Sequence, residues 1–176
     1  MKYDLVFVGN LSYAPNIDAV EYIANRLLDK LKKIKPEIKI LISGSNPSNK
    51  ILKYSSKNIT VQGWIPDIRK AYYQGKIFIA PLRIGSGLQN KLLEAMSLKM
   101  PCITTKLANM ALEAKHEQEL FIANNDEEFV EIIEKLLLNQ DLMNQIGENA
   151  RAFVKNNFDW KKSTNKLAEN FTAKRR

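Results

Sequence analysis

Short apolar runs alternate with helical patterns along most of this chain. The apolar runs lie at residues 4–8, 38–42, 58–62, 76–80, 102–104 and 119–123. Each run is short and apolar at successive positions, so both faces of the strand it predicts are buried. Strands of this kind are typical of a parallel sheet covered by helices.

Between these runs, apolar residues recur every three or four positions, as on one face of a helix. The longest stripe predicts an amphipathic helix with Asn16 as its N-cap; it comprises Ile17, Val20, Ile23 or Ala24, Leu27, Leu28, Leu31 and Ile34. A second helix is predicted to begin at Leu88, with Leu92, Ala95 and Met96 on the same face.

The last third of the sequence predicts three further helices. Asn125 with Glu128 forms a capping-box pattern before an apolar stripe, and Asn139 precedes another stripe. The final predicted helix, residues 163–173, is polar on most faces. A helix this polar is expected to lie across another surface or to fray.

The alternation of strands and helices predicts an α/β fold. We expect a Rossmann-like parallel sheet of about six strands flanked by helices, followed by C-terminal helices. Ligands in such folds bind beyond the carboxyl ends of the strands. Four predicted loops leave those ends, at residues 9–15, 44–47, 63–66 and 81–88, and all of them contain glycine or proline.

Length and composition indicate an ordinary globular domain. The 176 residues are 45% hydrophobic and 26% charged, which suits one domain spanning residues 1–176, with residues 158–176 as its C-terminal helix. No apolar run is long enough to span a membrane, and no signal peptide is recognisable. The single cysteine, Cys102, lies in an apolar run and is expected to be a buried, inert thiol. These features predict a cytoplasmic chain, or the cytosolic part of a larger protein.

The net charge of +8 raises the question of a polyanionic partner. The basic residues are scattered, and the cluster at residues 30–35 fills the polar face of a predicted helix. This pattern favours a solvated surface over a nucleic-acid interface, so no nucleic-acid partner is expected. Peripheral association with an anionic membrane surface stays open, which would place the chain at the inner face of the membrane.

Candidate chemistry concentrates in residues 81–101. Gly85, Ser86 and Gly87 lie between a predicted strand and a predicted helix, where backbone N–H groups and the helix dipole favour an anion. Lys91 and Glu94 are three residues apart and share a helix face, and Glu94 is expected to be partly buried. The sequence therefore predicts a phosphate site with a cation and a carboxylate beside it. A plain flexible turn at the glycines remains the alternative.

Two further polar residues are candidates for ligand contact. Arg83 is either a surface residue or a clamp for phosphate, which a guanidinium can bind through two hydrogen bonds. Asn10, in the first loop, is free to reach a ligand. His116 lies in a charged run and is expected to be an exposed loop residue rather than a catalytic base.

Several common chemistries lack their motifs. The sequence contains no histidine, cysteine and aspartate cluster with the spacing of metal ligands, and no Asp-x-Asp pair. The first loop lacks the Gly-x-Gly-x-x-Gly fingerprint, which disfavours a nicotinamide or flavin enzyme. We therefore expect no metal and no cofactor.

Five stretches resemble the C-terminal, donor-binding domain of GT-B glycosyltransferases. They are residues 6–19 (VFVGNLSYAPNIDA), 64–71 (WIPDIRKA), 78–101 (FIAPLRIGSGLQNKLLEAMSLKMP), 119–129 and the closing 158–160 (FDW). The resemblance is to the retaining subgroup called group 1, which is related to glycogen and sucrose synthases. It runs almost from end to end, and residues 85–96 are its most specific part.

The resemblance implies which residues bind the donor. Glu94 would hold the ribose, as the second carboxylate of the family's Glu-x7-Glu motif, whereas Ser86 stands where the first carboxylate is expected. Arg83 and Lys91 would carry the charge opposite the diphosphate. The implied donor-binding set is Asn10, Ile65, Arg83, Gly85, Ser86, Gly87, Leu88, Gln89, Lys91 and Glu94; no catalytic residue is assigned in this half.

The implied function is donor binding in a retaining glycosyltransferase. The complete enzyme would move a hexosyl group from a nucleotide-diphosphate sugar to a glycan or lipid-linked acceptor. An N-terminal acceptor domain is missing from this chain, and the predicted helix at residues 163–173 would pack on it. The isolated domain is expected to be inactive. The alternatives are a nucleotide-sugar 2-epimerase-like domain and a non-enzymatic basic module that binds polyanions.

Overall fold

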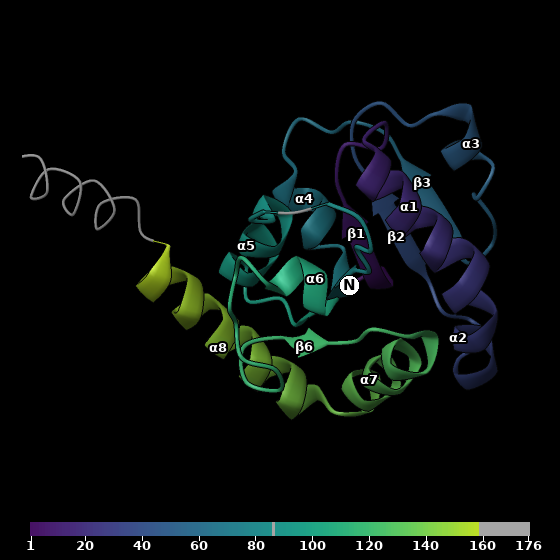
Figure 1. Ribbon diagram of the computed structural model, residues 1–176. Helices are drawn as coiled ribbons and strands as arrows, with labels where there is room; N and C mark the ends of the chain where they lie inside the picture. Colours follow the sequence, from purple (N-terminus) through teal and green to yellow (C-terminus); the bar gives the residue numbers. More distant parts are fainter. Residues whose placement is uncertain (86, 159–176) are drawn as a thin grey trace, which may run out of the picture.

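The predicted parallel sheet is confirmed in the computed structural model, which describes residues 1–85 and 87–158 (Figure 1). Six strands pair in the order β3-β2-β1-β4-β5-β6, and every pair is parallel. The strands are β1 (Tyr3–Val8), β2 (Ile40–Ser43), β3 (Ile59–Gln62), β4 (Gly75–Ala80), β5 (Cys102–Thr104) and β6 (Phe121–Ile122). Each predicted apolar run thus coincides with a strand, and the ends differ by no more than two residues.

The helices alternate with the strands, as the sequence pattern predicts. They are α1 (Ala14–Tyr22), the π-helical segment η1 (Ile23–Leu27), α2 (Leu28–Ile34), α3 (Asn49–Leu52), α4 (Arg69–Tyr72), α5 (Asn90–Ser97), α6 (Lys106–Asn109), α7 (Asp126–Leu138) and α8 (Gln140–Asn157). The segments α1, η1 and α2 form one continuous helix, which is the long amphipathic helix predicted from its stripe.

The strand order reverses its direction between β1 and β4. From β1 the chain moves outward to β2 and β3, then returns past β1 to β4 and continues to β5 and β6. Right-handed crossovers in opposite directions place their helices on opposite faces of the sheet. Figure 1 accordingly shows α1 and α2 on one side of the molecule and α4 and α5 on the other. In folds of this kind the reversal marks the ligand-binding crevice.

The core lies between the sheet and these two helix layers. The strands β1, β2 and β4 are buried at almost every position, because helices cover both of their faces. The largest side chains without exposed surface include Phe7, Tyr72, Phe78, Phe121 and Phe129. Burial on this scale is the main source of stability in a domain of this size.

Two predicted helix starts are wrong. Asn16 does not cap the first helix, because the helix already begins at Ala14, with Tyr13 as N-cap and Pro15 within its first turn. Proline is favoured there, since its fixed φ suits a helix and its missing N–H would have no partner. Leu88 lies before α5 and is exposed, whereas Leu92, Ala95 and Met96 are buried as predicted.

The C-terminal helices begin where the sequence places them. The Asn125 side chain accepts a hydrogen bond from the Glu128 N–H at 2.9 Å, and Asn139 caps α8 in the same way through the Leu142 N–H. Helix α7 packs against η1 and α2, and α8 packs against α5. The predicted helix at residues 163–173 lies outside the described residues.

Candidate functional site

A cavity of about 380 Å³ opens at the carboxyl ends of β1, β2 and β3. It lies next to the point where the strand order reverses, as expected for a ligand site in this topology. Its lining is Val8, Gly9, Gly44, Ser45, Trp64, Ile65, Pro66, Ile68, Tyr72, Lys91 and Glu94. The cavity therefore collects residues from three of the four predicted loops and from α4 and α5.

Two glycines form the part of the lining at the ends of β1 and β2. A Cβ atom on Gly44 would lie 1.6 Å from the carbonyl oxygen of Gly9, and a Cβ atom on Gly9 would lie 2.7 Å from Nδ2 of Asn16. A side chain is therefore excluded at Gly44, where the obstacle is backbone, whereas a Cβ atom at Gly9 would require the Asn16 side chain to shift. The backbone itself faces the cavity here, which lets a ligand approach closely.

Lys91 brings a positive charge into the cavity and forms no ion pair with a described carboxylate. Its Nζ donates to Oδ1 of Asn16 at 2.7 Å and to Oε1 of Gln89 at 3.4 Å, and no described carboxylate lies within ion-pair distance. Burial lowers the pKa of Lys91, and the charge of Glu94 partly opposes this effect. A half-buried ammonium group of this kind attracts an anionic ligand, because the charge of Glu94 offsets its desolvation only in part.

Asn16 holds Lys91 in this position. The Asn16 side chain is buried in the first turns of α1, and its Nδ2 donates to the backbone carbonyl of Asn10 at 2.8 Å. Its Oδ1 is therefore turned toward Lys91. The sequence pattern predicted Asn16 to cap the helix, whereas in the structure its side chain positions Lys91.

Glu94 lies on the same face of α5 as Lys91, as predicted. The prediction that it is partly buried is wrong, because its side chain is exposed at the cavity. Its Oε2 accepts a hydrogen bond from the Tyr72 hydroxyl at 2.8 Å. The carboxylate has no ion-pair partner among the described residues, so it can accept further hydrogen bonds from a ligand.

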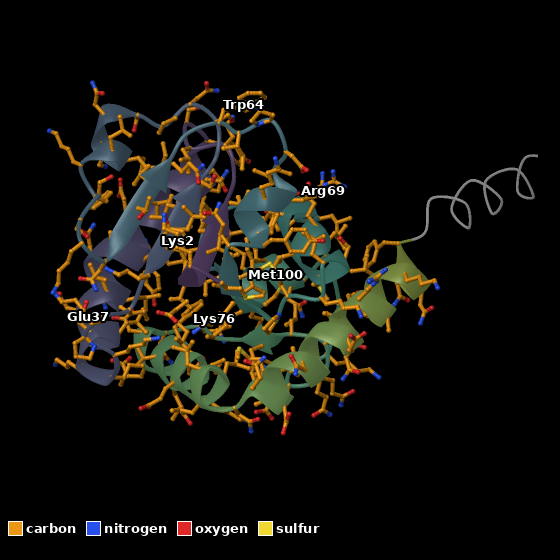
Figure 2. The ribbon with its side chains drawn as sticks, turned by 180° about the vertical axis from the view of Figure 1, so that it is seen from behind. Lys2, Glu37, Trp64, Arg69, Lys76 and Met100 are labelled. Carbon is orange, nitrogen blue, oxygen red and sulfur yellow. The ribbon has the colours of Figure 1, made fainter. Side chains whose placement is uncertain are left out.

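The segment after β3 forms an apolar wall of the cavity. Trp64, Ile65 and Pro66 all contribute, and Trp64 is 71% exposed. Figure 2 shows Trp64 at the top of the molecule, far from Lys76 and Glu37 at the other end of the sheet. An apolar wall beside a few polar groups is typical of small-molecule sites.

Arg83 does not line the cavity. Its guanidinium donates to both carboxylate oxygens of Asp18, at 2.6 and 3.1 Å, and lies 4.8 Å from the ring centroid of Tyr22. The Tyr22 hydroxyl in turn donates to Asp126 at 2.6 Å. Arg83 therefore connects the start of the glycine loop, residues 85–87, to α1, and its guanidinium contacts Asp18 and Tyr22.

The glycine loop lies between Arg83 and α5. Gly85 and Gly87 have φ angles of +100° and +94°, in the region that L-residues with side chains rarely adopt. The Gln89 side chain donates to the carbonyl of Gly87 at 3.2 Å. Ser86 lies outside the described residues, and Leu88 is exposed and does not line the cavity.

The remaining candidates lie away from the cavity. The Asn10 side chain accepts hydrogen bonds from the Ser12 N–H and hydroxyl at 3.0 and 2.8 Å. His116 is exposed and accepts from the Ile122 N–H. Cys102 is fully buried, and burial raises the pKa of its thiol, as expected of an inert cysteine.

Residues 1–85 and 87–158 contain neither a candidate metal site nor a candidate membrane-spanning helix. These residues contain no group of three or more histidine, cysteine, aspartate or glutamate side chains that could hold a metal ion. No helix among them is long and apolar enough to cross a membrane.

A larger hollow of about 520 Å³ lies at the opposite end of the sheet. Met1, Gly75, Lys76 and Met100 contribute to its lining, at the amino ends of β1 and β4. Figure 2 shows Lys76 and Met100 in this lower part, below Trp64. Parallel sheets bind ligands at the carboxyl ends of their strands, so this hollow is the less suitable site despite its size.

Of the eleven residues that line the cavity, the sequence predicted three as site residues, Ile65, Lys91 and Glu94. Among the other eight, Gly9, Gly44 and Ser45 lie in loops predicted at the correct edge of the sheet, but only the strand pairing shows that these loops meet. Tyr72 reaches Glu94 across 22 residues of sequence, and no local pattern indicates that hydrogen bond.

A family model and related proteins match this chain. The model described as "Glycosyl transferases group 1" matches residues 2–139. An uncharacterized 44.6 kDa protein in the cps region of Klebsiella pneumoniae is 30% identical over 92% of this chain and 45% of its own length. An uncharacterized glycosyltransferase of Methanocaldococcus jannaschii is 31% identical over 97% of this chain and 45% of its own length. The chain thus spans about half the length of these curated relatives.

Solved structures share the fold. The crystal structure of HepE from Anabaena in complex with UDP-glucose superposes with a TM-score of 0.78 at 15% sequence identity. The match covers 97% of this chain and 49% of the HepE chain. The architecture of this domain is therefore that of one half of a larger GT-B fold.

Proposed function

This chain belongs to the group 1 glycosyl transferases, and from that membership we propose that it binds a nucleotide-diphosphate sugar donor in the cavity beyond β1, β2 and β3. The family assignment rests on the model that matches most of the chain, independently of the cavity. The proposal adds the place of binding and the residues that contact the donor.

The observation that carries this proposal is the pairing of Lys91 with Glu94 in one cavity. Lys91 has amide partners but no carboxylate partner among the described residues, and so suits the diphosphate. Glu94 offers carboxylate oxygens three residues along the same helix, and so suits hydroxyl groups of the ribose. A nucleotide-diphosphate sugar carries both kinds of group close together.

The remaining surfaces of the cavity suit the rest of the donor. Ile65 and its neighbours would contact the apolar face of the base, and the backbone of Gly9 and Gly44 leaves room for a ligand to approach closely. Gly85 and Gly87 do not line the cavity. We assign Arg83 to holding this loop, because Asp18 occupies its guanidinium. Gln89 would support Lys91 from the other side.

In the complete enzyme these groups would stabilise the departing nucleoside diphosphate. Negative charge grows on the diphosphate as its bond to the sugar breaks, and a fixed ammonium group and backbone N–H groups lower the energy of that state. We propose transfer of a hexosyl group with retention and without a metal ion. Ser86, which stands where the Glu-x7-Glu motif of the resembled family has its first carboxylate, would affect which sugar is accepted.

The substrates are inferred from similar proteins. Because HepE of Anabaena binds UDP-glucose, UDP is the first nucleotide to test. The Klebsiella relative lies in a cps region, which supports an acceptor of the glycan or lipid-linked kind. Since the relatives are about twice as long, we propose that a second, N-terminal domain binds this acceptor, and that the 176-residue chain alone binds the donor without transferring the sugar.

The test is calorimetric titration of the 176-residue chain with UDP, GDP and ADP. We expect at least one of them to bind, and Glu94→Ala to weaken that binding by about 1–3 kcal/mol through the loss of charged hydrogen bonds. Glu131→Ala is the matched control, because Glu131 is exposed on α7 and makes no side-chain hydrogen bond or ion pair among the described residues. Equal affinities of the wild type and Glu94→Ala would refute the site.

The same titrations separate the two rival functions. A basic module without enzymatic role would bind heparin or DNA and no nucleoside diphosphate, and that result would refute the proposal. A nucleotide-sugar 2-epimerase-like domain would bind UDP but would need acid and base groups. The described residues around the cavity supply Lys91 and Glu94 alone as titratable charged groups. Epimerisation of a UDP-sugar by the complete protein would favour that rival.

A further inference from the structure

Tyr72 connects the buried core to the exposed carboxylate of Glu94. It is the last residue of α4, its side chain is fully buried, and its ring packs against Phe78 of β4 at a centroid distance of 5.5 Å. Tyr72 also lines the cavity, and its hydroxyl donates to Oε2 of Glu94 at 2.8 Å. The buried Tyr72 thus restrains the exposed Glu94 side chain through this hydrogen bond.

The direction of this hydrogen bond is fixed by chemistry. Burial, and after it the negative charge of Glu94, raise the pKa of the Tyr72 hydroxyl, so it stays protonated and donates. The Glu94 carboxylate accepts. A second contact, to the backbone carbonyl of Lys91 at 3.3 Å, keeps the hydroxyl at the start of α5.

This contact restricts a side chain that would otherwise be free. An exposed glutamate samples many rotamers, and fixing them costs free energy when a ligand binds. Here one oxygen of Glu94 is already held, and no described residue occupies the other through a hydrogen bond or ion pair. The held carboxylate keeps its remaining lone pairs available to accept from two neighbouring hydroxyl groups.

We propose that Tyr72 is a positioning residue that fixes the Glu94 carboxylate for the vicinal 2′- and 3′-hydroxyl groups of a ribonucleotide. Tyr72 therefore contributes to the preference for ribose over deoxyribose in the donor. This inference rests on the proposed function, because it requires a nucleotide in the cavity. It deepens that function by naming Tyr72 as the residue that positions Glu94 for these hydroxyl groups.

The test compares UDP with 2′,3′-dideoxy-UDP on the 176-residue chain, with Tyr72→Phe as the variant. Phenylalanine keeps the packing on Phe78 and removes only the hydroxyl. We expect Tyr72→Phe to weaken UDP binding by about five- to tenfold, because the carboxylate must now be ordered by the ligand. Binding of the dideoxy nucleotide should change by less than about twofold, since it offers Glu94 no diol to bind.

Tyr73→Phe is the matched control, since Tyr73 is the neighbouring residue, is 57% exposed and does not line this cavity. It should leave both affinities unchanged. A double variant adds a second criterion: on a Glu94→Ala background, Tyr72→Phe should have no further effect on UDP binding, because it acts only through that carboxylate. Thermal unfolding of each variant shows whether the fold is retained.

Two results would overturn the inference while leaving the proposed function in place. One is an equal loss of UDP and dideoxy-UDP affinity in Tyr72→Phe, which would indicate a general structural effect. The other is a further loss of UDP affinity when Tyr72→Phe is added to Glu94→Ala, so that the two effects on affinity are additive. Failure of the wild type to bind any nucleoside diphosphate would instead refute the proposed function itself, and this inference with it.

Discussion

Gly44 occupies a position where only a glycine fits. Its neighbour across the sheet is Gly9, whose carbonyl oxygen lies where a Cβ atom on Gly44 would have to be. The contact involves two backbones, so a side chain at Gly44 could not rotate away from it. The close approach of β1 and β2 at the cavity therefore depends on this one residue.

We expect Gly44→Ala to lower the free energy of unfolding by about 2–3 kcal/mol, because the two strand ends must separate to admit the methyl group. Gly63→Ala is the matched control: Gly63 follows β3, and a Cβ atom there would have no neighbour within 4 Å. Urea unfolding of both variants measures the difference. Equal midpoints for the two variants would show that the strand ends relax without cost.

The helices on one face of the sheet are joined through a single carboxylate. Asp126, the first residue of α7, accepts hydrogen bonds from Tyr22 at 2.6 Å and from Nε of Arg26 at 3.0 Å, and it forms an ion pair with Lys30 at 3.3 Å. These partners lie on α1, η1 and α2. Burial raises the pKa of Asp126, but these donors outweigh burial and leave the pKa below its ordinary value.

The lowered pKa predicts a loss of stability in acid. A carboxyl group whose pKa is lower in the folded state stabilises the fold above its unfolded pKa of about 4, and this contribution disappears as the pH falls through the folded pKa. We expect Asp126→Asn to cost about 2 kcal/mol at neutral pH. The gap between wild type and variant should narrow below about pH 4.

Urea unfolding across this pH range checks that expectation. Asp141→Asn is the control, because Asp141 is exposed on α8 and makes no side-chain hydrogen bond or ion pair among the described residues. A gap between wild type and Asp126→Asn that stays constant down to the lowest pH would mean that the charge of Asp126 does not stabilise the junction.

The sequence predicted the elements better than their ends. Apolar runs and capping residues such as Asn125 act locally, so the strands and the last two described helices could be placed from sequence. The role of Asn16 could not be predicted from sequence, because its partners Lys91 and Asn10 meet it only in the folded chain. The hydrogen bond of Tyr72 to Glu94 could not be predicted for the same reason.

The candidate site was predicted only in part, because local spacing shows which residues share a helix face but not which distant residues contact them. Lys91 and Glu94 share a helix face, which their spacing indicates, and Ile65 was drawn from the family resemblance. Arg83 has a partner, Asp18, that lies 65 residues away in the sequence, so composition alone could not show that its charge is engaged. Long-range contacts decide which charged residues remain free for a ligand.

Across the molecule, much of the positive charge is balanced locally. Lysines that form ion pairs with carboxylates are Lys30, Lys32, Lys35, Lys50, Lys57, Lys76, Lys99 and Lys135. The charge of these lysines is therefore engaged by neighbouring carboxylates and is less available to a polyanion. This distribution favours a specific anion site at Lys91 over broad polyanion binding.

We expect rising sodium chloride concentration to weaken UDP binding less steeply than heparin binding. Salt screens exposed charges strongly and half-buried ones less, and Lys91 is half-buried. Titrations of both ligands at several salt concentrations measure the two slopes. A UDP affinity that falls as steeply as heparin affinity would place the nucleotide on the exposed lysines.

The composition of the cavity also limits how its specificity can evolve. Where β1 and β2 end, Gly9 and Gly44 present backbone to the cavity, and Gly44 admits no side chain, so mutation can hardly alter the surface there. Trp64 and Ile65 lie in the loop after β3 and can change without disturbing the strand pairing. Descendants of this domain could therefore acquire new ligand preferences by single substitutions in this loop while inheriting the same backbone at the ends of β1 and β2.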